Sequence, residues 1–296
     1  IGDDAALISV GNDQELAIST DMLVAGTHFF ADADAYKLGW KSLAVNLSDM
    51  AAIGAQPKWA TLAIALPSND SDWLKRFSDG FFTCANKFGI DLIGGDTTRG
   101  PLTINIQIMG EVPRGKAMKR SGAQIGDDIW VSGKLGLAAL GLAYLQKKQD
   151  IPQDLLATHL QALHEPQPRV SLGLALLGIA NSCLDISDGL LADLGHILKA
   201  STVGATLQLD QIPSSPYIEA HYQEPAFQQY VLAGGDDYEL CFTAAEEHRM
   251  HIHNIATTLD LPITRIGKII AGESITVLDK NKQVVPYHFQ GYNHFA

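Results

Sequence analysis

Aspartates stand beside glycines or hydroxyl side chains at the ends of apolar segments in several separate parts of this chain. In residues 90–101, an apolar run leads into Gly94, Gly95 and Asp96, which two threonines and an arginine follow. Glycine permits backbone angles and close approaches that a Cβ would forbid, so we predict a strand that ends in a polar loop. By itself, the run fits equally well a tight turn whose Asp side chain bonds its own backbone.

The same arrangement recurs, and the recurrence favours a ligand site over isolated turns. It is found at Asp3 and Asp4, Asp21, Asp96, Asp127 and Asp128, Asp185 and Asp188, and Asp236 and Asp237. Two of these places have simpler explanations. The pair at 127 and 128 follows a glycine and fits an ordinary turn, and Ser187 and Asp188 can cap the next helix, which contributes about 1 kcal/mol without a ligand. Asp49 differs, because it lies on an apolar segment with helical spacing.

If several of these carboxylates meet, cations must accompany them. Like charges ~4 Å apart repel by about 4 kcal/mol per pair at an effective dielectric constant of ~20. Mg²⁺ takes oxygen ligands, usually a few carboxylates together with water and phosphate oxygens. Thr20 and Thr97 add hydroxyls beside Asp21 and Asp96. The leading hypothesis is therefore a site with several metal ions that handles phosphate groups.

Composition limits the remaining classes. The 296 residues carry 21 Lys and Arg against 33 Asp and Glu, a net charge of −12, so neither nucleic acid nor an anionic membrane is expected as a partner. Cys84, Cys183 and Cys241 are far apart in apolar settings, which indicates buried, reduced thiols in a cytoplasmic protein. No apolar run approaches the ~18 residues of a membrane span. The chain begins at Ile1 within what resembles a motif, so we expect further residues before it.

Apolar periodicity predicts an α+β fold with two domains. Residues 1–113 are predicted as strand, strand, helix, strand, helix, strand, strand, and the first two strands would form a hairpin near Asp3 and Asp4. Residues 114–296 mix helices with short strands in a loosely similar way. We place the boundary where Pro113 and the residues after it break a strand.

The usual nucleotide-binding and catalytic signatures are absent from the sequence. It contains no GxxxxGK[ST], no GxGxxG after a strand, no protein-kinase motif set and no HExxH. Any use of ATP therefore requires a different structural solution. A non-catalytic acidic module that binds divalent ions stays open as an alternative.

Six motifs, in order, resemble those of the thiamine-monophosphate kinase family, within the aminoimidazole-ribonucleotide-synthetase-like superfamily. They are Gly2-Asp3-Asp4, Ser19-Thr20-Asp21, residues 46–55, Gly94-Gly95-Asp96-Thr97-Thr98, Asp185-Ile186-Ser187-Asp188-Gly189 and residues 234–240. The resemblance runs from Ile1 to the tail. Its specificity lies in the order of the motifs, since no single one would suffice.

The resemblance implies an ATP-dependent kinase that converts thiamine monophosphate to thiamine diphosphate by direct in-line transfer with several Mg²⁺ ions. It implies a two-domain synthetase-like fold: an N-terminal domain (1–113) whose mixed sheet has flanking helices and forms a homodimer, and a C-terminal α/β sandwich domain (114–296). The implied metal ligands are Asp4, Ser19, Thr20, Asp21, Asp49, Asp96, Asp185 and Asp188. Gly95, Asp96, Arg120 and Ser187 would contact ATP, and His28, Asp236 and Phe289 the thiamine substrate.

Two positions depart from the family pattern. The family usually has Gly-Gly-Glu-Asp where this chain has Asp236, one methylene shorter, and often Trp where Phe289 stands. Both changes affect the predicted substrate contacts, and neither changes the predicted class of reaction. Without the resemblance, His28 would be taken as a surface loop residue and Phe289 as a packing residue of the tail.

Other members of the superfamily are alternatives. A selenophosphate synthetase would need a reactive Cys or selenocysteine near the start of the chain, ahead of Ile1. The hydrogenase-maturation relative ends in a functional Cys, whereas this chain ends Asn293-His294-Phe295-Ala296. Aminoimidazole ribonucleotide synthetase is compatible with the fold, but the Gly-Gly-Asp-Thr-Thr run fits it less well.

Overall fold

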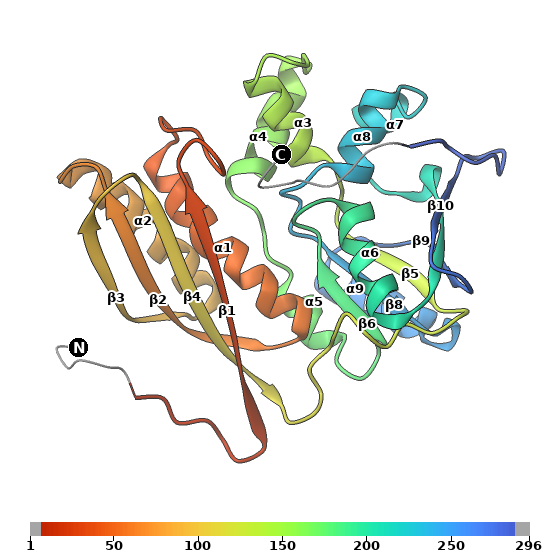
Figure 1. The fold of residues 1–296 in the computed structure, drawn as a ribbon, viewed down its shortest axis with the longest axis horizontal. Coiled ribbons are helices and arrows are strands. Elements are labelled where there is room, and N and C mark those ends of the chain that lie inside the picture. The colour runs from red at the N-terminus through yellow and green to blue at the C-terminus, as the bar shows by residue number, and fades with distance from the viewer. Residues whose placement is uncertain (1–6, 288–296) are drawn as a thin grey trace.

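Two β-sheets with flanking helices form the protein in the computed structural model, which describes residues 7–287 (Figure 1). The first unit comprises β1 (Gln14–Val24), α1 (Ala35–Ile53), β2 (Gln56–Leu66), α2 (Ser71–Phe88), β3 (Asp91–Arg99) and β4 (Thr103–Pro113). The second unit begins with β5 (Asp128–Ser132), α3 (Leu137–Leu145), α4 (Gln153–His164), α5 (Val170–Ala175), β6 (Ser182–Asp185), α6 (Leu190–Ser201) and β7 (Gly204–Gln208). It continues with a 3₁₀ turn (Leu209–Gln211), α7 (Pro216–Ala220), α8 (Pro225–Ala233), β8 (Leu240–Ala244), a 3₁₀ turn (Glu246–His248), α9 (Arg249–Leu259), β9 (Ile263–Ile270) and β10 (Ile275–Leu278).

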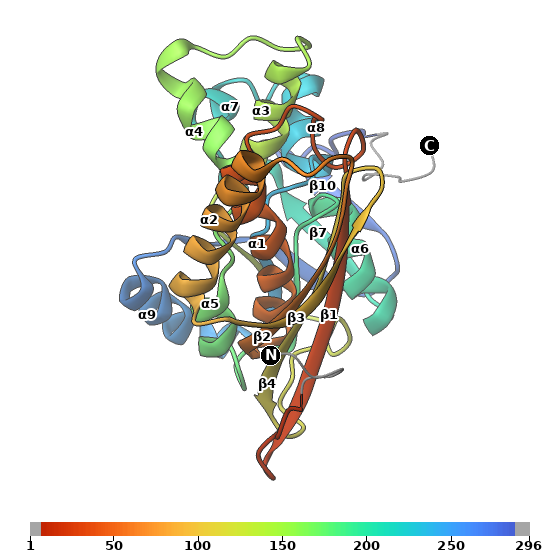
Figure 2. The ribbon, with the colours of Figure 1, turned by 90° about the vertical axis from the view of Figure 1, so that its left-hand side faces the viewer.

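The first sheet is mixed, with the strand order β1-β4-β2-β3. Only β2 and β3 run parallel. Helices α1 and α2 lie on one side of it (Figure 2). They pack so closely that a Cβ on Gly80 would lie only 1.9 Å from the carbonyl oxygen of Tyr36. On the other face β1 exposes the apolar side chains of Ile18 and Met22, each 55% exposed. This face of the sheet is called the open face below.

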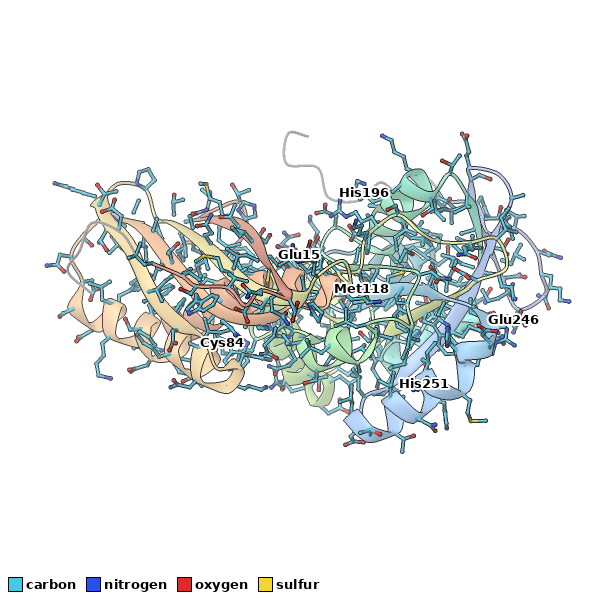
Figure 3. All side chains as sticks on the ribbon, turned by 90° about the horizontal axis from the view of Figure 1, so that it is seen from below. Glu15, Cys84, Met118, His196, Glu246 and His251 are labelled. Carbon is cyan, nitrogen blue, oxygen red and sulfur yellow. The ribbon has the colours of Figure 1, made fainter. Side chains whose placement is uncertain are left out.

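The second sheet has six strands in the order β10-β7-β9-β5-β8-β6. One apolar core is shared between the two units, since buried residues of α1 and β4 cluster with Trp130 and Phe242 of the second sheet. Met118, on the connection between the two units, is buried and lies between them (Figure 3). Its backbone N–H donates to the carbonyl of Ile53 at the end of α1. Helix α1 is therefore fixed against both units.

The α+β fold with a mixed, helix-covered first sheet confirms the expectation from sequence. The expected helices and strands of residues 14–113 are present, and apart from β3 their ends lie within a few residues of those expected. Local signals set these ends: Asp34 caps α1 and accepts from the Lys37 N–H, and Gly54 ends it at φ 70°. The three cysteines are buried and free, as expected. Within residues 7–287, no helix is both long and apolar enough to cross a bilayer.

Two predictions about local structure were wrong, and one helix was missed. Gly94, Gly95 and Asp96 are not in a loop, because β3 continues through them to Arg99, paired with β2. The glycine at 95 is needed there since a Cβ would lie 1.9 Å from the Leu62 carbonyl oxygen. The expected N-terminal hairpin is not found in the part of the chain that the structure describes, where β1 pairs with β4 alone and residues 7–10 form no strand. Helix α7 was not foreseen.

Candidate active site

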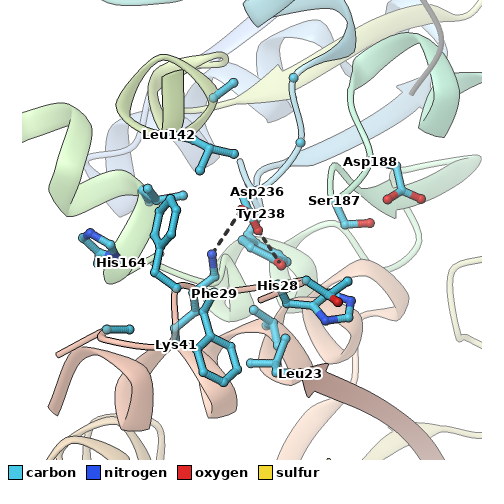
Figure 4. Close-up of a pocket in the computed structure, with 18 of the residues that line it drawn as sticks. Leu23, His28, Phe29, Lys41, Leu142, His164, Ser187, Asp188, Asp236 and Tyr238 are labelled. Atoms are coloured by element: carbon cyan, nitrogen blue, oxygen red, sulfur yellow. Dashed lines mark hydrogen bonds and ion pairs between the residues drawn. The ribbon is translucent and has the colours of Figure 1, made fainter. Parts of the chain in front are cut away.

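A cavity of about 1040 Å³ lies between the two units (Figure 4). Its walls come from the end of β1 and the loop after it, from α1, α3, α4 and α8, and from the segments that follow β6 and precede β8. Seven residues that the sequence singled out line it: Asp21, His28, Asp49, Asp185, Ser187, Asp188 and Asp236. They come from parts of the chain more than 200 residues apart.

One end of the cavity is acidic. Asp21 of β1, Asp49 of α1 and Asp185 at the end of β6 approach one another here. Burial, and then the nearby Asp49, raise the pKa of Asp21 to about 7. Burial, followed by the charge of Asp49, raises the pKa of Asp185 to about 8. Burial also raises the pKa of Asp49, opposed by the hydroxyl of Ser19, which donates to Asp49 Oδ2 at 2.5 Å, and by the charge of Arg120.

The raised pKa values indicate that these carboxylates lack compensating positive charge. Partly buried carboxylates without a matching number of cations hold their negative charge at a cost. Among residues 7–287, no three His, Cys, Asp or Glu side chains form a ready-made metal cage. A few oxygen donors without a cage suit Mg²⁺, which usually keeps water and phosphate oxygens in its coordination shell. The donor set of this end therefore fits a magnesium ion bound together with a phosphorylated ligand.

Thr20 and Asp96 do not reach this acidic end within one chain. Residues alternate between the two faces of a strand, so Ser19 and Asp21 face α1 whereas Thr20 lies on the open face, where its hydroxyl accepts from Asn105 Nδ2 at 3.1 Å. Asp96 is paired with Ala63, on the open face as well. Strand β3 is also the far edge of the sheet from β1, three strand spacings or roughly 14 Å away.

Gly95 lies beside Asp96 on β3 and is equally remote from the acidic end in a single chain. Mg–O distances are about 2.1 Å, so Asp21 and Asp96 of one chain cannot share an ion. Arg120 is exposed on the connection between the units, close enough to Asp49 to lower its pKa. Asp4 and Phe289 lie outside the described residues.

Asp193 organises the loop after β6, and no sequence pattern pointed to this role. Its carboxylate Oδ2 accepts three backbone N–H groups, from Ser187 at 3.0 Å, Asp188 at 2.9 Å and Gly189 at 3.0 Å. Burial raises the pKa of Asp193 to about 6. The residue looks like any polar position in the first turn of α6, so only the folded loop reveals what it does. Through these bonds it fixes the backbone from which the side chains of Ser187 and Asp188 project.

Replacing Asp193 by alanine is expected to loosen this loop. The three N–H groups lose their acceptor, and we expect the free energy of unfolding to fall by about 2 kcal/mol. Chemical denaturation measures this loss. The matched control is Asp154→Ala at the exposed first turn of α4, which should change the unfolding free energy by less than about 0.5 kcal/mol. Equal stability of the two variants would contradict the role given to Asp193.

The other end of the cavity combines one ion pair with apolar side chains. Asp236 has a left-handed backbone (φ 68°), and its N–H donates to the Ser187 carbonyl at 2.9 Å. Its carboxylate lies 3.1 Å from Lys41 Nζ and accepts from the Tyr238 hydroxyl at 3.1 Å (Figure 4). Phe29, Phe30, Leu142, Leu160, Leu163 and Tyr230 line the surrounding wall.

His28 lies in the loop after β1 and lines this cavity rather than a remote surface. Its Nδ1 accepts from the Val24 N–H at 3.0 Å, which fixes the orientation of the ring. His164 lies at the same end, and burial together with the charges of Lys37 and Lys41 lowers its pKa. The cavity thus has an acidic end suited to metal and phosphate and an opposite end suited to a ring-containing organic group.

Comparison with known proteins places the chain in a family. The family model of the AIR synthase related protein, N-terminal domain, matches residues 2–112, and that of the C-terminal domain matches residues 124–280. Thiamine-monophosphate kinases of Salmonella typhimurium and Escherichia coli (strain K12) are each 46% identical to it, over 100% of this chain and 91% of their own length.

Solved structures agree with this assignment. The thiamine-monophosphate kinase of Stenotrophomonas maltophilia K279a is 47% identical, with a TM-score of 0.88 over 93% of this chain and 89% of that one. A structure described as "AaThiL complexed with AMPPCP and TMP" is 30% identical, with a TM-score of 0.84 over 100% of this chain and 92% of that one. The hydrogenase maturation protein HypE, at 20% identity and a TM-score of 0.77, shares the fold. The chain therefore belongs to the AIR synthase related family and, within it, to the thiamine-monophosphate kinases.

Proposed function

We propose that this protein transfers the terminal phosphoryl group of ATP to the phosphate of thiamine monophosphate, giving thiamine diphosphate and ADP. One observation carries the proposal: a single cavity joins the acidic end at Asp21, Asp49 and Asp185 to the end formed by His28 and Asp236. A substrate with a phosphate at one end and aromatic rings at the other matches this division. The relative bound to AMPPCP and TMP supports both ligands.

Several Mg²⁺ ions are part of the proposal, with ligands drawn from Asp4, Ser19, Thr20, Asp21, Asp49, Asp96, Asp185 and Asp188. When bound, magnesium would neutralise charge on the phosphates and hold the reacting groups in line. The buried carboxylates with raised pKa support this assignment, because a cation would relieve their repulsion.

The remaining predicted site residues would hold the two ligands in position and would not transfer protons. Arg120 would pair with the ATP phosphates from the edge of the acidic end, and the loop held by Asp193 would present Ser187 to the nucleotide. Gly95, without a side chain, would let the backbone of β3 approach the phosphates. Phe289 and His28 would contact the thiamine rings. Holding the acceptor phosphate near ATP accounts for much of the rate in such transfers.

A homodimer is the second part of the proposal. The open face of the first sheet carries exposed Ile18 and Met22, which a second copy would cover. The same face carries Thr20 and Asp96, which cannot reach the acidic end of their own chain. We infer that the second copy brings its Asp96 to this site. We further propose a cytoplasmic location, consistent with three free thiols, and a domain boundary at 113/114.

Asp236→Ala is expected to raise the KM for thiamine monophosphate about ten-fold, because a charged hydrogen-bond acceptor is lost from that end of the cavity. The KM for ATP should stay near the wild-type value. Steady-state kinetics with each substrate varied in turn measures the difference, with Asp210→Ala, an exposed aspartate, as the control. A similar rise in both KM values would place Asp236 outside the substrate end.

The function itself is tested by incubating the protein with ATP, MgCl₂ and thiamine monophosphate and separating the products. ADP and thiamine diphosphate should form in equal amounts, and unphosphorylated thiamine should not replace the monophosphate. ADP with inorganic phosphate would favour another ATP-dependent member of the family. Divalent-ion binding without any turnover would favour a non-catalytic metal-binding module.

A further inference from the structure

Lys41 is a buried cation that the proposed reaction leaves without a role. Its side chain is only 6% exposed, and its ammonium lies 3.1 Å from Asp236 Oδ2. Removing a lysine ammonium from water is costly unless a partner compensates, and an apolar side chain could fill the same space at less cost. Its position in the wall of the cavity therefore calls for an explanation beyond packing.

Helix α1 connects Lys41 to the acidic end. Lys37, Lys41, Val45 and Asp49 follow one another at four-residue intervals, so they lie along one stripe of the helix, and all four line the cavity. Eight residues of helix separate Lys41 from Asp49 by about 12 Å. Since α1 packs against both units, it holds the ammonium and the acidic end at a fixed separation.

The carboxylate of Asp236 is held on both of its oxygens. Oδ2 faces Lys41 and Oδ1 accepts from the Tyr238 hydroxyl, while the backbone N–H is bonded to Ser187. A carboxylate has about four lone-pair positions, so each oxygen keeps one for a ligand. The side chain is still 30% exposed. The two contacts therefore decide in which direction the remaining lone pairs point into the cavity.

We propose that Lys41 is a positioning residue for thiamine monophosphate, acting through Asp236: the ammonium fixed in α1 orients the carboxylate that receives the substrate. This inference rests on the proposed function and extends it to a residue outside the substrate contacts. The Lys41 side chain is 6% exposed and that of Asp236 is 30% exposed, so the carboxylate is the more accessible of the two groups and Lys41 acts on the substrate through it. Loss of Lys41 should weaken binding at this end and leave ATP, at the other end, unaffected.

The test is a double-mutant cycle on the full chain with Lys41→Met, Asp236→Asn and the double variant. Calorimetric titration with thiamine monophosphate in the absence of nucleotide gives the dissociation constant for each. We expect Lys41→Met alone to weaken binding about ten-fold, with the KM for ATP unchanged. The double variant should bind as weakly as Asp236→Asn and no more weakly, because residues that act in series are not additive.

The matched control is Lys75→Met, which also removes a lysine paired with a carboxylate, that of Asp79, on the exposed side of α2 and outside the cavity lining. It should leave the dissociation constant unchanged. Unchanged binding in Lys41→Met would overturn the inference, and so would additive losses in the double variant, which would indicate an independent contact. If Lys41→Met does not fold, weaker binding by the double variant than by Asp236→Asn would still overturn the inference, because it would show a contact that Asp236 does not mediate.

Failure of this inference is distinguishable from failure of the function. A wild-type protein that forms no thiamine diphosphate would defeat the proposed function. A wild-type protein that forms it, with Lys41→Met binding the substrate equally well, would defeat only the role of Lys41.

Discussion

Asp49→Asn is expected to lower turnover about a thousand-fold, equivalent to about 4 kcal/mol of transition-state stabilisation, while the fold stays intact. Asp49 lies at the centre of the acidic end, where it contacts Ser19 and influences the pKa of both Asp21 and Asp185. Asparagine keeps the shape and one acceptor oxygen but removes the charge that would hold Mg²⁺. Steady-state turnover at saturating ATP, Mg²⁺ and thiamine monophosphate measures the effect.

Two controls separate this effect from a loss of structure. Thermal unfolding should show Asp49→Asn to be at least as stable as the wild type, since it removes a repelled buried charge. Asp79→Asn on the exposed side of α2 should keep full turnover. Near-normal turnover in a folded Asp49→Asn protein would refute the assignment of the acidic end as the metal site.

Mixing two inactive variants is expected to restore activity. If the second copy supplies Asp96, Asp21→Asn and Asp96→Asn proteins are each inactive alone, but a mixed dimer contains one site with both aspartates intact. Random reassortment places half of the chains in mixed dimers, so about a quarter of the wild-type activity should return. Activity is measured after the two proteins are mixed and allowed to exchange subunits.

The proportion of each variant provides the control. Activity should be greatest at an equimolar ratio and fall on either side of it. The activity of wild-type protein should not change when two wild-type samples are mixed. If Asp96→Asn retains wild-type turnover alone, or if the mixture stays inactive although subunits exchange, Asp96 does not complete a site across the dimer. A monomer in solution would contradict the dimer directly.

Local sequence patterns were sufficient for most of the first unit. The helices α1 and α2 have regular apolar spacing, an aspartate cap at the start and a left-handed glycine at the end, so their limits depend on nearby residues alone. The part of β3 from Gly94 onward was mistaken for a loop because its two glycines resemble turn residues. Their reason is tertiary: the backbone of Gly95 approaches Leu62 too closely for a side chain, which no local pattern reveals.

The candidate site could be predicted as a set of residues but not as an arrangement. The ordered motifs and the resemblance that they carry identified seven residues that line one cavity. They could not indicate that Thr20 and Asp96 lie on the open face, because that depends on strand register and sheet order. Asp193 and Lys41 were missed for a related reason. Each has an ordinary place in a helical pattern, and each acquires its partners only when distant segments meet.

Direct transfer between two phosphorylated ligands predicts that the terminal phosphoryl group of ATP passes to thiamine monophosphate without release into solution. The protein is incubated with ATP labelled in that group, together with Mg²⁺ and thiamine monophosphate, and the label is located after separation of the products. The label should appear in the terminal phosphate of thiamine diphosphate in an amount equal to the ADP formed. Label found in inorganic phosphate, with thiamine monophosphate left unchanged, would contradict the account.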